Sequence, residues 1–224
     1  MGIGSRSEVK KFLKTCRVKL NGKFEKNSNT QVDIEKDEIL FDDEGVIYKE
    51  FTYLMLNKPK DYISATFDAK LSTVLDLLDF PYSNMELFPV GRLDIDTTGF
   101  LILTNDGKFS YNVTNPKKKV NKKYFVTLRD DITSEQIESL ENGVYFEKED
   151  FTTENAKVEK ISKKEINLTI SEGKFHQVKR MLEYVGNEVV ELKRVCIGNL
   201  NLDEELKLGE YREITNSELE EIFK

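Results

Sequence analysis

The spacing of apolar residues along the chain predicts its secondary-structure elements. Some stretches have the spacing of strands and others that of helices. Strand-like runs occupy residues 52–58, 100–103, 123–128, 158–161, 166–170 and 189–197. Helical spacing marks residues 5–14, 71–78, 108–115, 133–140, 175–184 and 217–223. Because strands and short helices are mixed without a regular βαβ repeat, the pattern predicts an α+β fold. Its central sheet should be mixed, largely antiparallel and flanked by short helices.

The first fifty residues have the pattern of a small separate domain. In residues 5–14 a serine stands where it can cap a helix, and three apolar residues fall on one helical face. A short strand then leads into Asn21-Gly22, a dipeptide typical of tight hairpin turns. We therefore expect a small domain at residues 1–49 and a main domain at residues 50–224.

Composition is that of a soluble protein with a packed core. The 224 residues are 38% hydrophobic and 33% charged, which leaves room for one main domain and a small appendage. No apolar run is long enough to span a bilayer, and the start of the chain lacks a signal-peptide core. Cys16, Cys196 and the single histidine, His176, have no metal-binding spacing. We expect a reduced, cytoplasmic setting, no membrane association and no metal site.

Charge is unevenly distributed, although the net charge of −7 at first argues against a nucleic-acid partner. Residues 1–24 contain seven basic side chains and one acid, and residues 107–129 contain seven basic side chains and no acid. Acidic residues gather instead at 33–44, 135–154 and 203–221. Solvated surfaces can produce such segregation by chance. Two acid-poor blocks on either side of a carboxylate-rich loop nevertheless favour a polyanionic partner.

That loop lies in residues 87–107, LFPVGRLDIDTTGFLILTNDG. Two strand-like runs bracket a turn that holds Asp94 and Asp96 beside Arg92. A plain β-hairpin with a surface salt bridge is one interpretation, and a loop that presents a reactive carboxylate is the other. An aspartic peptidase is excluded because such enzymes need two Asp-Thr-Gly motifs, whereas this single DTTG has an extra threonine.

Two stretches together carry a resemblance to a known family. GRLD-x-DTTG, an apolar run and T-x-DG span residues 91–107, and EGKFHQVKRM with a later L-x-R spans residues 172–194. With the tail IGNLNLDEELKLGEYREIT and an early helix followed by RVKLNG, they resemble bacterial rRNA pseudouridine synthases of the RsuA/RluB/RluE/RluF family. HQVKRM is closer to the RsuA branch, which modifies a uridine of small-subunit rRNA. The large-subunit branches more often have NRQIRRM.

The resemblance implies that Asp94 is the catalytic residue. Isomerising uridine to pseudouridine needs a carboxylate kept ionised, either as a nucleophile or as a proton acceptor, and no cofactor. Lys179 aligns with the cation that pairs with this carboxylate, and Arg180 is its neighbour. Since adjacent helical residues point about 100° apart, only one of the two can face Asp94. Tyr124, in a K-x-Y-x-V pattern, is implied to pack against the target base.

Further residues are expected to contact RNA. They are basic or polar side chains of the first acid-poor block and of the two signature stretches: Arg6, Lys10, Lys14, Arg17, Arg92, Lys174, His176 and Gln177. The early helix resembles the small RNA-binding domain of the S-four type. The family usually has another helix ahead of this segment, so we expect the appendage to lack its first helix. The expected partner is ribosomal RNA, either small-subunit rRNA or an assembly intermediate, bound by a monomer.

Other interpretations of the same residues remain open. Lys179 and Arg180 are also compatible with an exposed cationic pair, and Tyr124 with an ordinary core position. His176 alone would more often be structural than catalytic. Two functional alternatives compete with modification of small-subunit rRNA. One is a synthase for large-subunit rRNA, and the other is a noncatalytic RNA-binding factor in ribosome assembly.

Overall fold

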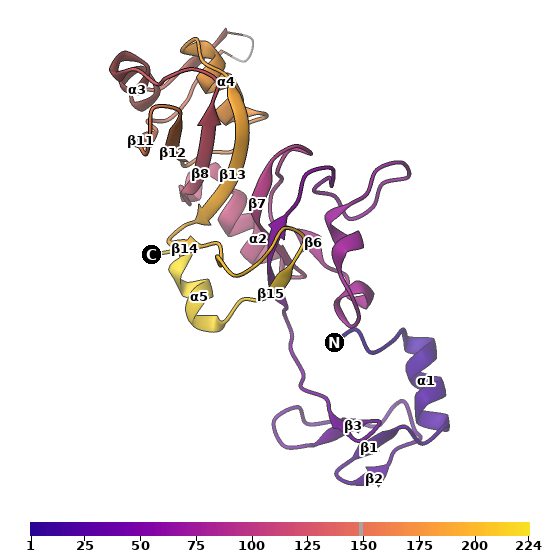
Figure 1. Ribbon diagram of the computed structural model, residues 1–224. Coiled ribbons are helices and arrows are strands. Elements are labelled where there is room, and N and C mark those ends of the chain that lie inside the picture. Colours follow the sequence, from indigo (N-terminus) through magenta and orange to yellow (C-terminus); the bar gives the residue numbers. More distant parts are fainter. Residues whose placement is uncertain (148–149) are drawn as a thin grey trace. The chain divides into compact units, whose positions relative to one another are not determined.

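The computed structural model describes residues 1–147 and 150–224, and the chain divides into two compact units (Figure 1). Residues 1–52 and 78–87 make up the first unit. Residues 53–77 and 88–224 make up the second. The expected domains at 1–49 and 50–224 stay a prediction. No helix in the described part of the chain is both long enough and apolar enough to cross a membrane.

The first unit contains one α-helix and a small sheet. Helix α1 (Arg6–Lys14) begins at a capping box in which Ser5 accepts from the backbone of Glu8, as the serine predicts. The sheet has the order β2-β1-β3-β4, with β1 (Val18–Leu20), β2 (Lys23–Phe24), β3 (Ile39–Phe41) and β4 (Glu44–Gly45). Asn21 and Gly22 both have positive φ, so the predicted tight hairpin is confirmed.

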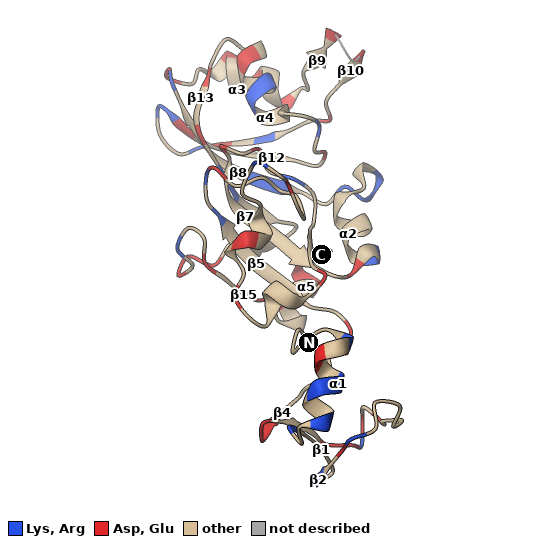
Figure 2. Ribbon diagram, turned by 90° about the vertical axis from the view of Figure 1, so that its right-hand side faces the viewer, with Lys and Arg blue, Asp and Glu red and all other residues tan. Residues whose placement is uncertain are grey.

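Four basic side chains of this unit were expected to contact RNA. The basic residues Arg6, Lys10 and Lys14 are exposed on α1, where Figure 2 shows basic bands. Arg17 is also exposed, but it has partners within the unit. It pairs with Asp42, and its guanidinium lies 4.6 Å and 4.7 Å from the ring centroids of two phenylalanines. All four residues in this unit that were expected to contact RNA are therefore exposed, three of them on α1.

The second unit is built on a sheet of order β11-β12-β8-β13-β7-β5-β15, with β14 against β13 and β6 against β7. Only the β13–β7 pair is parallel among the described strands of this sheet, so the expectation of a mixed, largely antiparallel sheet is confirmed. Its strands are β5 (Tyr53–Lys58), β6 (Phe88–Pro89), β7 (Thr98–Thr104), β8 (Lys122–Leu128), β11 (Lys157–Lys160), β12 (Glu165–Ile170), β13 (Val189–Ile197), β14 (Leu200–Asn201) and β15 (Tyr211–Glu213). Strands β9 (Tyr145–Phe146) and β10 (Phe151–Thr152) form a separate ribbon.

Short helices accompany this sheet, as an α+β fold requires. They are α2 (Gly107–Thr114), α3 (Ser134–Glu141), α4 (Gln177–Tyr184) and α5 (Asn216–Glu221), with the 3₁₀ turn η3 (Pro116–Lys118). The core between the sheet, α2 and α5 includes Met55, Phe100, Ile102, Phe109 and Ile222, all less than one-tenth exposed. Helix α3 begins at a capping box formed by Thr133 and Gln136.

The helix expected at residues 71–78 is only the 3₁₀ turn η1 (Val74–Leu77). Ile63 forms an isolated bridge with Thr73 and donates its backbone N–H to Ser72 O at 2.9 Å. Those residues are therefore held in extended geometry, and too few remain for an α-helix. In the first unit, the 3₁₀ turn η2 (Tyr82–Asn84) follows.

Gly99 allows β7 and β13 to approach closely. Its φ is +99°, and a Cβ there would lie 2.2 Å from the carbonyl oxygen of Arg194. The parallel register pairs Gly99 with Arg194 and Thr98 with Lys193. Because a side chain cannot occupy that space, only glycine permits this pairing. The contact fixes the strand that immediately follows the carboxylate loop.

Candidate active site

The loop between β6 and β7 carries Asp94, and a fully buried lysine holds its backbone. Lys58, at the end of β5, is 0% exposed. Its Nζ donates to the carbonyl oxygens of Asp94 at 3.1 Å, Thr97 at 2.9 Å and Pro59 at 3.0 Å. Burial lowers the pKa of Lys58 to about 8, and the nearby charges of Asp96 and Asp94 only partly oppose this. One cation thus ties both ends of the carboxylate turn to the central sheet.

A buried serine fixes the residue before Asp94. Ser64 Oγ accepts from Leu93 N and donates to Leu93 O, both at 3.0 Å. The backbone of Asp61 adds a further bond by donating its N–H to Ile95 O at 2.9 Å. A loop held at several successive peptide groups presents its side chains in a defined direction, as a reactive site needs.

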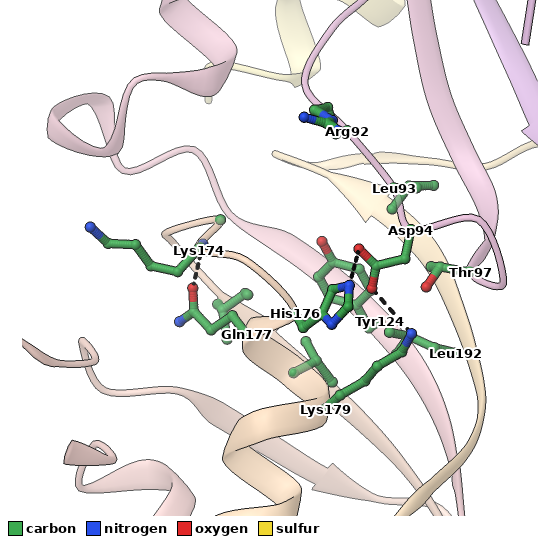
Figure 3. Close-up of a pocket in the computed structure, with 13 residues that line it drawn as sticks. Arg92, Leu93, Asp94, Thr97, Tyr124, Lys174, His176, Gln177, Lys179 and Leu192 are labelled. Carbon is green, nitrogen blue, oxygen red and sulfur yellow. Dashed lines mark hydrogen bonds and ion pairs between the residues drawn. The ribbon is translucent and has the colours of Figure 1, made fainter. Parts of the chain in front are cut away.

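The Asp94 carboxylate lies between two basic side chains (Figure 3). Lys179 Nζ is 3.2 Å from Oδ2, and His176 Nε2 is 3.5 Å from Oδ1. The Asp94 side chain is 27% exposed, so a substrate can reach it while much of the surrounding water is excluded. The arrangement places an ammonium group directly beside the carboxylate.

Lys179 binds two carboxylates at once. Its Nζ donates to both oxygens of Asp96, at 2.7 Å and 2.9 Å, in addition to the Asp94 contact. Burial lowers the pKa of Lys179, but the hydrogen bonds and charges of Asp96 and Asp94 outweigh burial and leave the pKa raised. The ammonium group therefore stays charged beside Asp94 at neutral pH.

His176 occupies a conformation that is unusual for a residue with a side chain. Its φ is +49°, and it immediately precedes α4, which begins at Gln177 instead of the expected residue 175. Its ring stacks on that of Phe175, with the centroids 3.8 Å apart. The left-handed turn directs the imidazole at Asp94. His176 was expected only to line the pocket or to contact RNA, but it lies against the carboxylate itself.

Tyr124 completes a pocket around these groups. It is 8% exposed on the inner face of β8 and lines the same pocket as Asp94. Asp94, Tyr124, His176 and Lys179 come from a loop, a strand and a helix start that are distant in sequence and line one pocket.

Residues 52–184, which include all four of these side chains, match the family model described as RNA pseudouridylate synthase. The chain belongs to this family. It is therefore an isomerase, and the sequence resemblance is confirmed. The synthase is 48% identical to the uncharacterized RNA pseudouridine synthase YtzG of Bacillus subtilis, over 97% of this chain and 92% of that protein.

Two further relatives support the same assignment. The synthase is 40% identical to the ribosomal small subunit pseudouridine synthase A of Haemophilus influenzae, over 98% of this chain and 94% of that protein. A solved structure described as a pseudouridylate synthase superposes with a TM-score of 0.73 at 40% identity. It covers 97% of this chain and 94% of the other. The fold is thus that of a known synthase.

Two other predicted site residues, Arg180 and Gln177, do not contact the Asp94 carboxylate. Arg180 points elsewhere than Lys179: its guanidinium lies 3.9 Å from the Phe146 ring centroid, and it donates to Phe175 O. Gln177 is buried and donates to Glu172 at 2.6 Å, so its amide supports the start of α4. These contacts give both side chains structural partners within the synthase.

Two basic residues that were expected to contact RNA are exposed at the edge of the pocket. Lys174 has its ammonium 4.5 Å from the ring centroid of Phe151, and Arg92 extends from the loop away from Asp94 (Figure 3). Both line the pocket. Their position suits contact with a nucleic acid that enters it.

Sequence reasoning missed three residues that build the site. Lys58 and Ser64 hold the loop, and the buried Arg194 donates from Nε to Phe100 O at 2.7 Å. Only Lys58 gave a signal in the sequence. It stands at the end of an apolar strand, and a charged side chain that is buried there needs a polar partner. Ser64 carries no comparable signal. Arg194 belongs to the L-x-R element, which by itself assigns no role.

Proposed function

We propose that the synthase converts a specific uridine of small-subunit (16S) ribosomal RNA to pseudouridine, with Asp94 as the reacting carboxylate. The observation that carries this proposal is Asp94 beside Lys179 at 3.2 Å in a pocket lined by Tyr124. The small-subunit target is supported by the name of the Haemophilus influenzae relative and by the sequence HQVKRM at residues 176–181.

The chemistry suits these residues. The reaction breaks the bond between the ribose and a ring nitrogen and joins the sugar to a ring carbon, so the atoms balance without a redox step. Asp94 acts either as a nucleophile at the sugar or as the acceptor of a ribose proton. In both cases the carboxylate must be ionised when the substrate arrives, and Lys179 places a positive charge 3.2 Å from it.

Tyr124 is proposed to pack against the target base. A base inside an RNA helix is out of reach of Asp94, so the nucleotide has to leave the stack before it reacts. Contact between an aromatic ring and the base recovers part of the unstacking cost. The rim residues Arg92 and Lys174 would contact the phosphates of the same strand, and His176 would adjoin the reacting nucleotide.

The first unit is proposed to strengthen RNA binding through the exposed cations of α1. We propose that the synthase acts as a monomer in the bacterial cytoplasm, where ribosomal RNA is assembled. A noncatalytic assembly factor is less consistent with the chain, because the carboxylate, its cation and the pocket tyrosine are all retained.

Deleting the gene and mapping pseudouridine in both ribosomal RNAs tests the proposal. One small-subunit site should lose its modification in the deletion strain, and the wild-type chain should restore it while Asp94→Asn should not. A missing site in large-subunit rRNA would overturn the small-subunit assignment and preserve the enzymatic class. Unchanged modification in all RNA would overturn the proposed reaction.

A further inference from the structure

A second pocket adjoins the active site and contains two buried cations. Arg92, Tyr124 and Gly173 line both pockets. The second pocket also includes Lys122, which is 8% exposed, and Arg194, which is 4% exposed. Buried cations normally have a carboxylate partner, and neither of these has an ion pair among the described residues.

Arg194 has an unused donor that faces no protein acceptor. Its Nε donates to Phe100 O at 2.7 Å, but the buried Nη2 has no hydrogen-bond partner in the part of the chain that the structure describes. A guanidinium group remains charged at all physiological pH values. An unsatisfied charged donor at this depth is uncommon, and it leaves the positive charge of Arg194 without a compensating acceptor at the wall of the pocket.

Lys122 brings a second positive charge to the same pocket. Its Nζ donates to Val113 O at 3.0 Å, near the end of α2. Burial lowers the pKa of Lys122 to about 8, and the charge of Arg194 acts in the same direction. The two cations are thus close enough to repel each other, and at neutral pH both remain charged.

The only acid lining this pocket among the described residues is Glu172, and its oxygens are already engaged. Oε1 accepts from Glu154 N and Oε2 accepts from Gln177 Nε2, both at 2.6 Å. Arg92 adds an exposed cation at the boundary with the active site. Three basic groups against one occupied carboxylate leave the pocket positively charged.

We propose that this pocket binds a phosphate group of the RNA backbone next to the target nucleotide, held by Arg194, Lys122 and Arg92. The proposal rests on the proposed function, because an RNA substrate supplies the phosphate. Tyr124 forms a wall of both pockets, so the base and a neighbouring phosphate of one strand occupy adjoining spaces. A guanidinium and an ammonium together match the charge and the acceptors of a phosphodiester.

The test uses Lys122→Met with Lys123→Met as its matched control. Methionine keeps the length of the buried side chain without its charge. Lys123 is the next residue of β8, lies on the opposite face and pairs with Glu159 at 3.7 Å. Both variants lose one positive charge, but only the first loses it from the pocket.

Single-turnover kinetics on an rRNA fragment that contains the mapped uridine separates binding from chemistry. Lys122→Met should raise the enzyme concentration for half-maximal rate about tenfold and reduce the salt slope of binding by about one, while the maximal rate stays within a few fold. Lys123→Met should leave all three values close to wild type. A folded Lys122→Met protein with unchanged half-saturation and salt slope would overturn the proposal.

A neutral backbone identifies the source of the phosphate. Each phosphate that flanks the target uridine is replaced in turn by a methylphosphonate. Both replacements should weaken binding of the RNA to the wild type. At one of the two positions, the replacement should have no effect on binding to Lys122→Met. Weakening of equal size in both proteins at both positions would contradict the proposal. So would protection of the wild type by inorganic phosphate without any effect of the methylphosphonates, since the site would then bind free phosphate.

If the wild type forms no pseudouridine in small-subunit rRNA, the proposed function fails by itself. The phosphate site is still tested in that case, because RNA binding by wild type and Lys122→Met can be compared on any rRNA fragment that the wild type binds. Equal affinities and equal salt slopes would then reject the site independently of the reaction.

Discussion

The ammonium group of Lys58 and the backbone of Asp94 are directly joined: Nζ donates to the Asp94 carbonyl oxygen at 3.1 Å. The same group reaches Thr97 O at 2.9 Å, so one buried cation spans the turn that presents the carboxylate. Backbone carbonyls left without a donor at this depth are costly, on the order of 1–3 kcal/mol each. The position of Asp94 therefore depends on a side chain that takes no part in the reaction.

The stability contribution of Lys58 should depend on pH. Its folded-state pKa is about 8, below the ordinary value of 10.5. Below pH 8 the Lys58 amine is protonated in both the folded and the unfolded protein. The full cost of burying its charge then opposes folding. As the pH rises from 8 to 10.5 the folded protein releases the proton first, so this contribution to the free energy of unfolding rises, by at most about 3 kcal/mol.

Lys58→Met removes this titration and the ammonium donor to the carbonyl oxygens of Pro59, Asp94 and Thr97. We expect the variant to be less stable than the wild type, and the difference in the free energy of unfolding to grow between pH 8 and 10.5. Urea denaturation of both proteins across that interval measures the difference. A difference that does not change with pH would show that the folded-state pKa of Lys58 is not lowered.

Asp94→Asn keeps the shape of the side chain and removes its charge. We expect product formation to fall by at least about two to four orders of magnitude, because the reacting group is removed. Folding and RNA binding should persist, since the backbone bonds from Lys58 and Ser64 do not involve the carboxylate. Rate measurements at saturating RNA check this. Activity within about tenfold of wild type would exclude the assigned role of Asp94.

Asp96→Asn is the matched control for that substitution. Its carboxylate is 62% exposed and shares Lys179 with Asp94. Removing the Asp96 charge leaves Lys179 to Asp94 alone, so the synthase should keep most of its activity. A decrease as large as that of Asp94→Asn would show that the two carboxylates cannot be assigned separate roles.

Much of this site was predictable because its strands have strong local patterns. The apolar runs of β5, β7 and β8 lie where the sequence places them, and Tyr124 alternates onto the buried face of β8. The choice between Lys179 and Arg180 was not predictable. It depends on where α4 begins, and that start is determined by the left-handed turn at His176. Lys58 could not be assigned either, because its acceptors lie on a distant loop.

Lys179→Met should reduce the rate more than it reduces RNA binding. The ammonium group is 3.2 Å from Asp94 and places a positive charge beside the reacting carboxylate. Loss of one such electrostatic partner typically costs on the order of 10²-fold in rate. Lys179→Arg keeps the charge and should recover part of that loss. Equal rates for Lys179→Met and Lys179→Arg would show that the charge of Lys179 is not what the reaction requires.

Gly99→Ala should destabilise the synthase strongly. The added Cβ would lie 2.2 Å from Arg194 O, and φ at this position is +99°, which disfavours any residue except glycine. Gly107→Ala is the control, because a Cβ at Gly107 meets nothing within 4 Å. Thermal unfolding should show a large decrease for the first variant and little change for the second. A stable Gly99→Ala protein would contradict the close approach of β7 and β13.

The last prediction concerns RNA binding by α1. Lys10 and Lys14 are exposed on this helix, and we expect Lys10→Gln with Lys14→Gln to flatten the salt dependence of rRNA binding, by roughly 0.7–0.9 for each phosphate that is no longer neutralised. The matched control is Lys36→Gln with Lys224→Gln, which removes the same charge from residues that each pair with a nearby carboxylate. Affinity titrations at several salt concentrations measure both slopes. If the two double variants have the same slope, α1 contributes only its net charge and does not contact RNA phosphates.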